Sequence, residues 1–313
     1  MQVKYNFFQF LSKYIANIAK LCYDVKNRRK GEAVLEEICS YRAEDLYFHH
    51  SLSPQPDPDR FSMHAHEMNE VLVFLSGTGS MLVEGNEYPM FPGAVMIMRA
   101  GESHKIRPSR GTAYERIGIR FSDSVFALLD PKGELLVPLR DRRLGSGNLI
   151  QIHSLQGLLP MLLKIGENAS PYRIRLAVIS FLFAVLNEAS ALHEKEDRLH
   201  REREEQGKNY EMIEYINHNL SADLSLDAIA ARFYLSKSQL SRSFKKATGS
   251  TLWDYVLIKR LLLARSLIRE GESISGACER SGFREYSSFY RAYKKRFGVS
   301  PNQDRTAGES IET

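Results

Sequence analysis

Four side chains in the first third of the chain have types and spacing that could bind a ligand: His64, His66, Glu70 and His104. In a β-strand His64 and His66 point to one face, and Glu70 joins them if the strand continues. Three imidazoles and a carboxylate suit zinc, iron or manganese. The same groups also suit a polar pocket for a small molecule. A third interpretation is that both strand histidines simply satisfy neighbouring polar groups.

A second set of side chains is repeated within the last hundred residues. Arg242, Phe244, Lys245, Lys246 and Gly249 recur 49 positions later as Arg291, Tyr293, Lys294, Lys295 and Gly298. Arginine can bond guanine with two hydrogen bonds, and lysines can neutralise phosphates. The repeat therefore predicts base-reading side chains at Ser238, Ser241, Arg242, Ser287, Tyr290 and Arg291. It predicts phosphate contacts from Lys245, Lys246, Lys294 and Lys295.

Each repeated unit has the pattern of a helix, a tight turn and a second helix. In the first unit Ser236 and Gln239 have the spacing of a capping box, which starts the outward-facing helix. Leu240 and Phe244 lie four residues apart and are predicted to pack inward, and Gly249 ends the helix. In the second unit Gly282-Phe283 forms the turn and Phe289 with Tyr293 forms the inner face.

A long apolar helix, from Leu252 to about Arg269, is expected to hold the two units at a fixed separation. If both outward-facing helices enter successive major grooves on one face of the DNA, they lie ~34 Å apart.

The region from Leu46 to about Phe121 is rich in short β-runs, including VLVFL at 71–75 and ERIGIRF at 115–121, separated by glycine-containing turns. This spacing predicts a small antiparallel barrel or sandwich. Arg116 and Arg120 alternate along the last of these runs, and we expect both to face outward.

Helical patterns follow the β-region. The segment Tyr172–Leu192 is apolar over most of its circumference and predicts a helix that is buried on several sides, by its own domain or by a second subunit. We expect it to serve dimerisation. Residues 194–208 are almost entirely charged or polar and predict a linker. Residues 1–45 are predicted to be a helical extension.

Charge is distributed unevenly along the chain. Residues 209–305 hold 16 Lys and Arg against 10 Asp and Glu, whereas the net charge of the whole chain is +5. The last third therefore carries all of the positive excess, which favours a polyanionic partner such as double-stranded DNA. Cys22, Cys39 and Cys278 form no CxxC pair, which favours a cytoplasmic location. No uninterrupted apolar run is long enough to span a bilayer, so no membrane partner is predicted.

The C-terminal region resembles the AraC/XylS family of bacterial transcription regulators over about residues 210–302. The segments that carry the resemblance are IAARFYLSKSQLSRSFKKATGST, TLWDYVLIKRLLLARSLI and GFREYSSFYRAYKKRFGVSP. The resemblance implies that both units bind DNA and that an activator, working with RNA polymerase, is favoured over a repressor. Glu285 departs from the family because it stands where Asp, a better helix cap, is usual. Gly276, Ala277 and Cys278 are further departures.

The β-rich region resembles the cupin-type sensor domain of the same family. The residues that carry this resemblance are His64-Ala65-His66, Glu70, Gly77, Pro92-Gly93 and Gly101-x-x-His104. Metal cupins use ligands of these four types, but Arg99 stands where they usually have proline. The resemblance therefore favours a pocket for a small effector, a sugar or sugar acid, lined by His64, His66, Glu70 and His104. It favours neither a metal, a cofactor nor a catalytic residue.

Together these patterns predict a multidomain α+β protein: a cupin-like β-barrel with a helical dimerisation segment, and an all-α domain with two helix-turn-helix units. The expected divisions are a helical extension (1–45), an effector-sensing domain (46–135), a dimerisation segment (136–193), a charged linker (194–208) and a DNA-binding domain (209–306). The helix-turn-helix units are expected at about 226–248 and 274–297. The predicted function is that of an effector-responsive DNA-binding regulator, an activator of carbohydrate-related genes that acts as a homodimer. Two alternatives remain: a metal-dependent cupin enzyme fused to a DNA-binding domain, and an architectural DNA binder.

Overall fold

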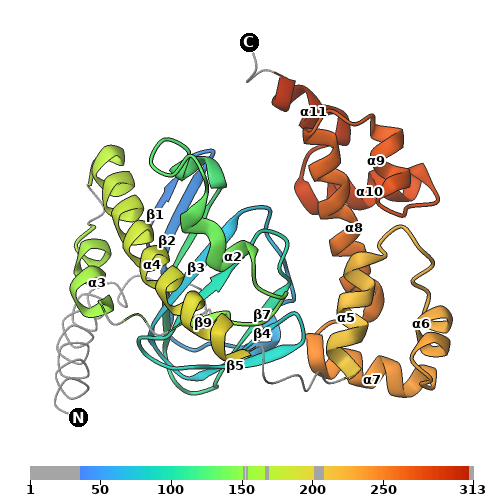
Figure 1. Ribbon diagram of the computed structural model, residues 1–313, viewed down its shortest axis with the longest axis horizontal. Coiled ribbons are helices and arrows are strands. Elements are labelled where there is room, and N and C mark those ends of the chain that lie inside the picture. Colours follow the sequence, from blue (N-terminus) through green and yellow to red (C-terminus); the bar gives the residue numbers. More distant parts are fainter. Residues whose placement is uncertain (1–35, 151, 153, 166–168, 201–207, 310–313) are drawn as a thin grey trace.

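The computed structural model describes residues 36–309, apart from 151, 153, 166–168 and 201–207. Most of the N-terminal segment that was predicted to be helical, residues 1–35, lies outside the described residues. The described chain forms a barrel domain (residues 36–200) and an all-helical C-terminal domain (residues 208–309), which lie beside each other (Figure 1).

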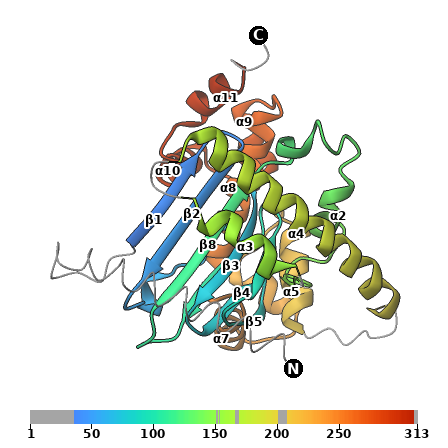
Figure 2. The ribbon, with the colours of Figure 1, turned by 90° about the vertical axis from the view of Figure 1, so that its left-hand side faces the viewer.

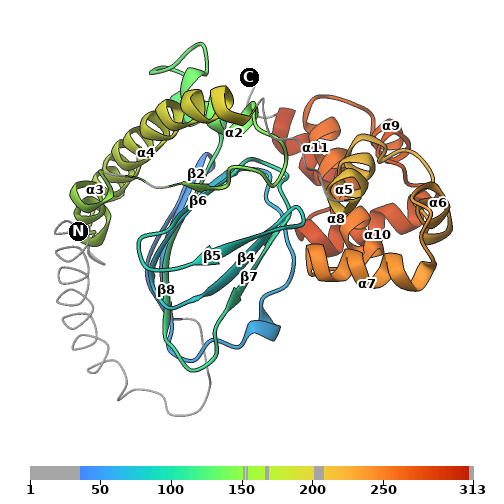
Figure 3. The ribbon, with the colours of Figure 1, turned by 60° about the horizontal axis from the view of Figure 1, so that its bottom comes forward.

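Two antiparallel sheets face each other in the barrel domain (Figure 3). One sheet has the strand order β1-β2-β8-β3-β6-β9 and the other has the order β5-β4-β7. Their bounds are β1 (Glu36–Arg42), β2 (Leu46–Ser53), β3 (Asn69–Ser76), β4 (Gly79–Val83), β5 (Asn86–Met90), β6 (Val95–Met98), β7 (His104–Pro108), β8 (Tyr114–Phe121) and β9 (Leu149–Ile150). Leu72, Phe74, Met81, Met96 and Ile106 are buried together in the core between the sheets. The predicted barrel is confirmed.

Strand β1 corrects the expected start of the barrel. Its residues fall inside the range predicted to be a helical extension, yet they pair along their length with β2, from Glu36 opposite Leu52 to Arg42 opposite Tyr47. The strand lies at the edge of the sheet and has few apolar side chains, so its sequence gives a weak strand signal.

Helices cover the outer face of the six-stranded sheet (Figure 2). The α-helices of this domain are α2 (Val137–Arg140), α3 (Leu155–Leu163) and α4 (Pro171–His200). Three short 3₁₀ helices are also present: η1 (Pro58–Arg60) between β2 and β3, and η2 (Asp123–Phe126) and η3 (Glu134–Leu136) between β8 and α2. Val178, Phe181 and Val185 of α4 are fully buried in one core with Phe48 and Ile119 of the sheet. The segment predicted to serve dimerisation is therefore also a structural layer of the barrel domain.

Helix α4 is long and apolar enough, by length and composition, to cross a membrane over Pro171–Ala191. Its packing against the sheet gives these apolar side chains another partner, as in the core helix of a water-exposed domain. The helix continues to His200, so the first seven residues of the predicted charged linker extend α4. Residues 201–207 of that linker lie outside the described residues.

The C-terminal domain is a bundle of seven helices among the described residues. Their bounds are α5 (Lys208–His218), α6 (Leu226–Arg232), α7 (Lys237–Thr248), α8 (Leu252–Arg269), α9 (Ile274–Arg280), α10 (Tyr286–Phe297) and α11 (Pro301–Glu309). Helices α6 and α7 form the first unit, α9 and α10 form the second unit, and α8 runs between them (Figure 1). Each unit has its own core: Leu240 and Phe244 are buried in the first, and Phe289 and Tyr293 in the second.

Candidate functional site

The outward-facing helix of the first unit, α7, begins and ends as its sequence predicts. The Ser236 hydroxyl accepts from the backbone N–H of Gln239 at 3.2 Å, and the Gln239 side chain accepts from the backbone N–H of Ser236 at 3.0 Å. Gly249 ends the helix with φ of 75°, a left-handed conformation that glycine adopts without strain. The capping box satisfies two backbone donors at the start of α7, which fixes the helix on its core.

The corresponding helix of the second unit, α10, is capped less completely. Glu285 occupies the N-cap position and its side chain makes no capping hydrogen bond, as the departure from aspartate predicts. Gly298 ends α10 with φ of 77°. The preceding helix, α9, is capped by Ser273, whose hydroxyl accepts from the N–H of Gly276 at 3.0 Å.

The side chains that were predicted to contact DNA are presented on the outer surfaces of these two helices. Exposed positions on α7 are Ser238, Ser241, Arg242, Lys245 and Lys246. Exposed positions on α10 are Ser287, Arg291, Lys294 and Lys295, while Tyr290 is half-buried. The inward residues keep the helices on their cores, so the exposed sets are carried on rigid elements.

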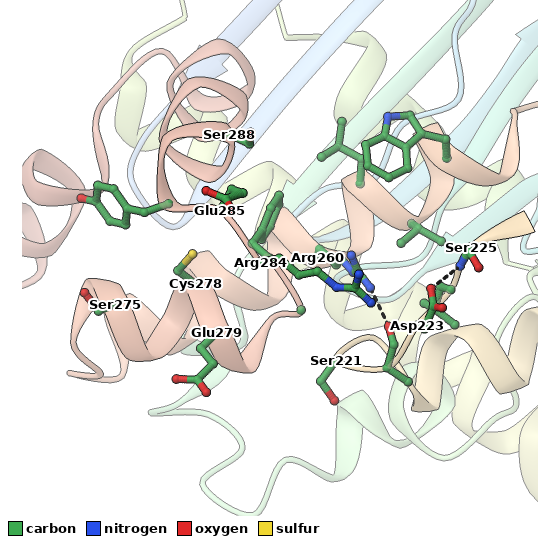
Figure 4. A pocket seen from close by; sticks show the side chains of 18 residues that line it. Ser221, Asp223, Ser225, Arg260, Ser275, Cys278, Glu279, Arg284, Glu285 and Ser288 are labelled. Carbon is green, nitrogen blue, oxygen red and sulfur yellow. Dashed lines mark hydrogen bonds between the residues drawn. The ribbon is translucent and has the colours of Figure 1, made fainter. Parts of the chain in front are cut away.

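A pocket of about 860 Å³ separates the two units (Figure 4). Its wall includes Ser225 of the first unit, Arg260 of α8 and Arg284 before α10. The Arg260 guanidinium donates to the carbonyl of Leu220 at 2.9 Å and to that of Ala222 at 2.8 Å. The pocket contains none of the predicted base-reading residues, so it is distinct from the predicted DNA-reading surface.

In the barrel domain, the structure brings His64, His66, Glu70 and His104 together; we call these residues the polar cluster. The ligand atoms of the three histidines all lie within 4.8 Å of one another. Glu70 Oε2 lies 3.1 Å from His104 Nε2 and 3.6 Å from His66 Nε2. The four side chains therefore lie together, as the sequence indicated, although the condition of one continuing strand is not met.

The polar cluster is assembled from separate segments rather than from one continuous strand. His64 forms an isolated antiparallel bridge with His104, the chain bends after His66, and Glu70 comes from β3 in the larger sheet. Glu70 therefore joins the histidines because the two sheets face each other, not because a strand continues from His66.

Backbone contacts orient two of the imidazole rings. His64 Nδ1 lies 2.9 Å from the Ser62 carbonyl, and His104 Nδ1 lies 3.0 Å from the Glu102 carbonyl. Carbonyl oxygens only accept, so each Nδ1 carries a proton and each Nε2 is left for the cluster. In that tautomer the 3.1 Å contact between His104 Nε2 and Glu70 Oε2 joins two acceptors, so these two atoms and His66 Nε2 are buried without a hydrogen-bond donor. Because these acceptor atoms are unsatisfied, they could bind a cation or accept hydrogen bonds from the hydroxyl groups of a ligand.

Burial sets the charge states of the cluster. Burial, reinforced by His104, lowers the pKa of His64 to about 4. Burial also lowers the pKa of His66 to about 2. Burial opposes ionisation of Glu70, but His104, His66 and Arg120 outweigh it and hold the pKa of Glu70 well below its ordinary value. His64 and His66 are therefore neutral and Glu70 is a carboxylate near pH 7, the forms that bind metals or hydroxyl groups.

Arg116 and Arg120 were expected to face outward, and that expectation is wrong. Arg120 Nε donates to Glu70 Oε1 at 3.0 Å, and Arg116 Nη1 donates to the buried hydroxyl of Tyr114 at 3.3 Å. Both faces of β8 are buried, because helices cover one side and the second sheet the other. Alternation in the sequence therefore could not indicate which face was which.

A contact between the barrel domain and α8 is a feature that the sequence did not indicate. Glu84, fully buried after β4, bonds the Tyr255 hydroxyl and accepts from Lys259 Nζ at 2.5 Å. Lys259 Nζ also donates to the Gly101 carbonyl at 2.7 Å. These partners are separated by more than 150 residues in the chain, so no local pattern could reveal them.

Residues 64–67 make a second contact with the C-terminal domain. Arg296 Nη2, on α10, donates to the Ala65 carbonyl at 2.8 Å. Glu67 Oε2 lies 3.0 Å from Arg265 Nη1 and 3.1 Å from Arg269 Nη1, both on α8. A pocket of about 450 Å³ lies beside this contact and includes His66, Glu67 and Lys259 in its wall.

Comparisons with known proteins agree with this domain order. Residues 53–112 match the family described as a cupin domain, and residues 229–307 match the family described as a helix-turn-helix domain. The HTH-type transcriptional activator RhaS of Mannheimia succiniciproducens is 25% identical over 255 residues, which cover 81% of this chain and 92% of the relative. The protein of the same description from Escherichia fergusonii is 24% identical over 261 residues, which cover 82% of this chain and 91% of the relative.

Among solved structures, the C-terminal domain of AraT, a response regulator from Geobacillus stearothermophilus, is 30% identical. The match covers 33% of this chain and 86% of that domain, with a TM-score of 0.32.

The two domain matches and the relatives along four-fifths of the chain define a DNA-binding transcription regulator with a cupin-like N-terminal domain. These matches agree with the resemblance of the chain to the AraC/XylS family of transcription regulators.

Proposed function

We propose that this protein is an effector-responsive transcription activator in which the polar cluster binds a small molecule and controls DNA binding by the C-terminal domain. The effector is a sugar or sugar acid, and the regulated genes are carbohydrate-related. The protein works in the cytoplasm as a homodimer, engages RNA polymerase at the promoter, and catalyses no reaction. The relatives described as transcriptional activators support activation rather than repression.

On DNA, Arg242 and Arg291 read bases and the neighbouring lysines hold the backbone. Their exposed positions on the outward-facing helices of the two units support this assignment. Base contacts specify the sequence, while phosphate contacts fix the register of the protein on the duplex.

Control of DNA binding by an effector is supported by the position of residues 64–67, which contribute to two sites at once. His64 and His66 contribute to the polar cluster, while Ala65 and Glu67 between and beside them bond α10 and α8. A ligand that moves either imidazole therefore also moves the contacts of the second unit. The effector shifts the arrangement of the domains by as much as its affinities for the two arrangements differ.

The polar cluster also has the composition to hold a divalent transition metal. Its orphaned imidazole nitrogens and carboxylate oxygen, buried within a few ångströms of one another, fit such an ion. His64, His66 and His104 would hold it with Glu70, and the ion would supply a Lewis-acid contact for oxygen atoms of the effector. That the pocket works without metal stays a prediction.

The proposed function is tested by selecting fragments of the source genome with the purified full-length protein at physiological salt. We expect a few fragments with a shared paired motif. Adding the small-molecule fraction of a cell extract should change the affinity for those fragments by about 5- to 150-fold. Affinity that is unaffected by any such fraction would contradict control by an effector.

A matched pair of variants tests the route between the two sites. E67Q removes the charge that Arg265 and Arg269 contact, whereas E87Q removes a surface carboxylate that lies 3.9 Å from Arg107 within the barrel. The effect of the extract should be lost in E67Q and kept in E87Q. Equal responses in both variants would mean that residues 64–67 do not transmit the signal.

The converged metal-ligand set also favours a second candidate function, a metal-dependent cupin enzyme anchored to DNA. Elemental analysis of the purified protein separates the two candidates at the first step. The regulator account predicts no stoichiometric metal. A full equivalent of metal, together with turnover of a cupin substrate by the metal-loaded protein, would favour the enzyme.

A further inference from the structure

The inner face of the larger sheet is polar along β2 and β8. On β2 the side chains of Leu46 and Phe48 belong to the core beneath α4. Because side chains alternate along a strand, Tyr47, His49 and Ser51 lie on the opposite, inner face. The same alternation on β8 places Arg116, Gly118 and Arg120 on the inner face, since Ile117 and Ile119 lie in the core beneath α4. This face is turned toward the smaller sheet (Figure 3).

The two arginines of this face differ in their partners. Arg120 pairs with Glu70 at 3.0 Å. Among the described residues Arg116 has no carboxylate partner: its guanidinium donates to the Tyr114 hydroxyl at 3.3 Å and lies 5.6 Å from the centroid of the Tyr114 ring. Arg116 Nε is buried without a hydrogen-bond partner. Arg116 is half-buried, and a guanidinium that is partly removed from water favours a neighbouring anion, which no described carboxylate supplies by direct contact.

Two neutral polar groups beside Arg116 also lack partners. Ser51 lies directly opposite Arg116 in the strand register, and His49 lies opposite Gly118, two residues further along β8 on the same face. Ser51 is 1% exposed and His49 is 6% exposed, yet Ser51 Oγ and His49 Nδ1 have no hydrogen-bond partner. Burial and the nearby Arg116 lower the pKa of His49 to about 4, so His49 adds no charge near pH 7.

Gly118 makes the position of His49 possible. A Cβ on residue 118 would lie 2.1 Å from His49 Cε1, closer than any real side chain permits. The His49 ring also stacks on the Tyr47 ring, with centroids 5.2 Å apart. The imidazole is therefore held in place before any ligand arrives, with its Nδ1 unpartnered.

We propose that Arg116, His49 and Ser51 form an anion subsite that binds the carboxylate of the effector. This inference rests on the proposed function of the barrel as an effector domain, and it adds the chemical class of the ligand. A guanidinium with an adjacent imidazole and hydroxyl group matches the acceptor atoms of a carboxylate. Arg120 lies on the same face and bonds Glu70, so the anion subsite adjoins the polar cluster. A sugar acid, with a carboxylate and several hydroxyl groups, suits the two sites together.

The test is thermal unfolding of the full-length protein in sodium glucuronate, compared with glucose plus sodium chloride at the same ionic strength. Glucuronate should raise the Tm of the wild type saturably, and glucose should raise it less. R116Q should weaken the glucuronate effect by at least about tenfold in apparent Kd, because it removes a charge-assisted hydrogen bond. R110Q should respond like the wild type, since Arg110 is exposed and paired with Asp59 at the surface.

Three outcomes would overturn the anion subsite: an equal rise with glucose, an undiminished rise in R116Q, or no rise in the wild type with glucuronate, succinate or benzoate. If R116Q does not fold, R116K replaces it, because lysine keeps the charge but lacks the Nε donor and the planar fork. R116K should then show a weakened response to glucuronate, and a full response would overturn the proposal. Operator selection is a separate assay of the proposed function. A protein that selects DNA fragments but ignores carboxylates fails only the anion subsite.

Discussion

The two outward-facing helices carry arginines at corresponding positions, Arg242 on α7 and Arg291 on α10, and both side chains are exposed. We predict that R242A and R291A each cost about 1–3 kcal/mol of binding free energy on selected fragments, and that each relaxes the base preference in one half of the motif. Competition binding against random DNA checks this, with R110A on the barrel as the control. Equal losses on selected and random DNA would show that these arginines contact only the backbone.

For the lysines that follow on the same helices, we predict an effect on affinity that does not depend on the DNA sequence. Lys245 is exposed one helical turn from Ser241, and we propose that it contacts a phosphate. K245A should weaken binding to selected fragments and to random DNA about equally. It should also reduce the slope of log K against log salt concentration by about one. Binding measured over a series of salt concentrations checks this. An unchanged slope would reject the phosphate contact.

Residue types and spacing were sufficient where one local motif decides the structure. The Ser236–Gln239 capping box, the end of α7 at Gly249 and the missing cap at Glu285 all follow from their own sequence neighbourhoods. The inner positions of Arg116 and Arg120 did not follow, because a strand buried on both faces gives no polar side by which to orient it.

At the scale of elements, the turn of the second unit depends on one glycine. Gly282 has φ of 88°, and an added Cβ would lie 2.2 Å from the Leu220 carbonyl oxygen. Gly298 has φ of 77°, with nothing within 4 Å of such a Cβ. G298A should therefore cost only the left-handed strain, about 1–2 kcal/mol, and G282A should cost clearly more. Denaturant unfolding of the two variants checks this, and equal losses would contradict it.

Helix α4 presents an apolar stripe on the side away from the sheet. Tyr172, Leu176 and Phe183 are 74%, 54% and 45% exposed, whereas the opposite side of the helix is buried. We predict that this stripe forms the homodimer contact, so L176E together with F183E should convert a dimer to a monomer. Sedimentation at micromolar concentration checks this. A wild-type protein that is already monomeric would exclude the homodimer. A dimer that survives both substitutions would mean that the contact lies elsewhere.

The order of the elements was largely predictable, because helix periodicity, glycine stops and β-rich runs are local signals. The bounds of α8 follow from its sequence. Strand β1 was missed because it is a polar edge strand that is stabilised only by pairing with β2. Glu70 was expected on the face of His64 and His66 only if one strand continued through all three. The chain bends between them, and the sheet arrangement brings the side chains together instead.

For the whole molecule, the contact between the barrel and α8 contains a buried ion pair. The Glu84 and Lys259 side chains are 0% and 8% exposed. E84Q leaves the lysine without its charge partner and should cost about 3–5 kcal/mol of unfolding free energy. K259M added to E84Q should recover part of that loss, while E87Q at the surface should cost little. Denaturant midpoints of the four proteins check this. A loss below about 1 kcal/mol in E84Q would show that the domains are not held through this pair.

Recognition of a DNA sequence by the C-terminal domain is measured as a ratio of two affinities. Binding of the full-length protein to a selected genomic fragment and to random DNA of the same length should be measured at one physiological salt concentration. We expect the selected fragment to bind at least about 10³-fold more tightly than random DNA, and we expect most of that ratio to be lost in the R242A/R291A double variant. A ratio near one, with or without the small-molecule fraction of a cell extract, would contradict sequence-specific regulation and would favour an architectural DNA binder.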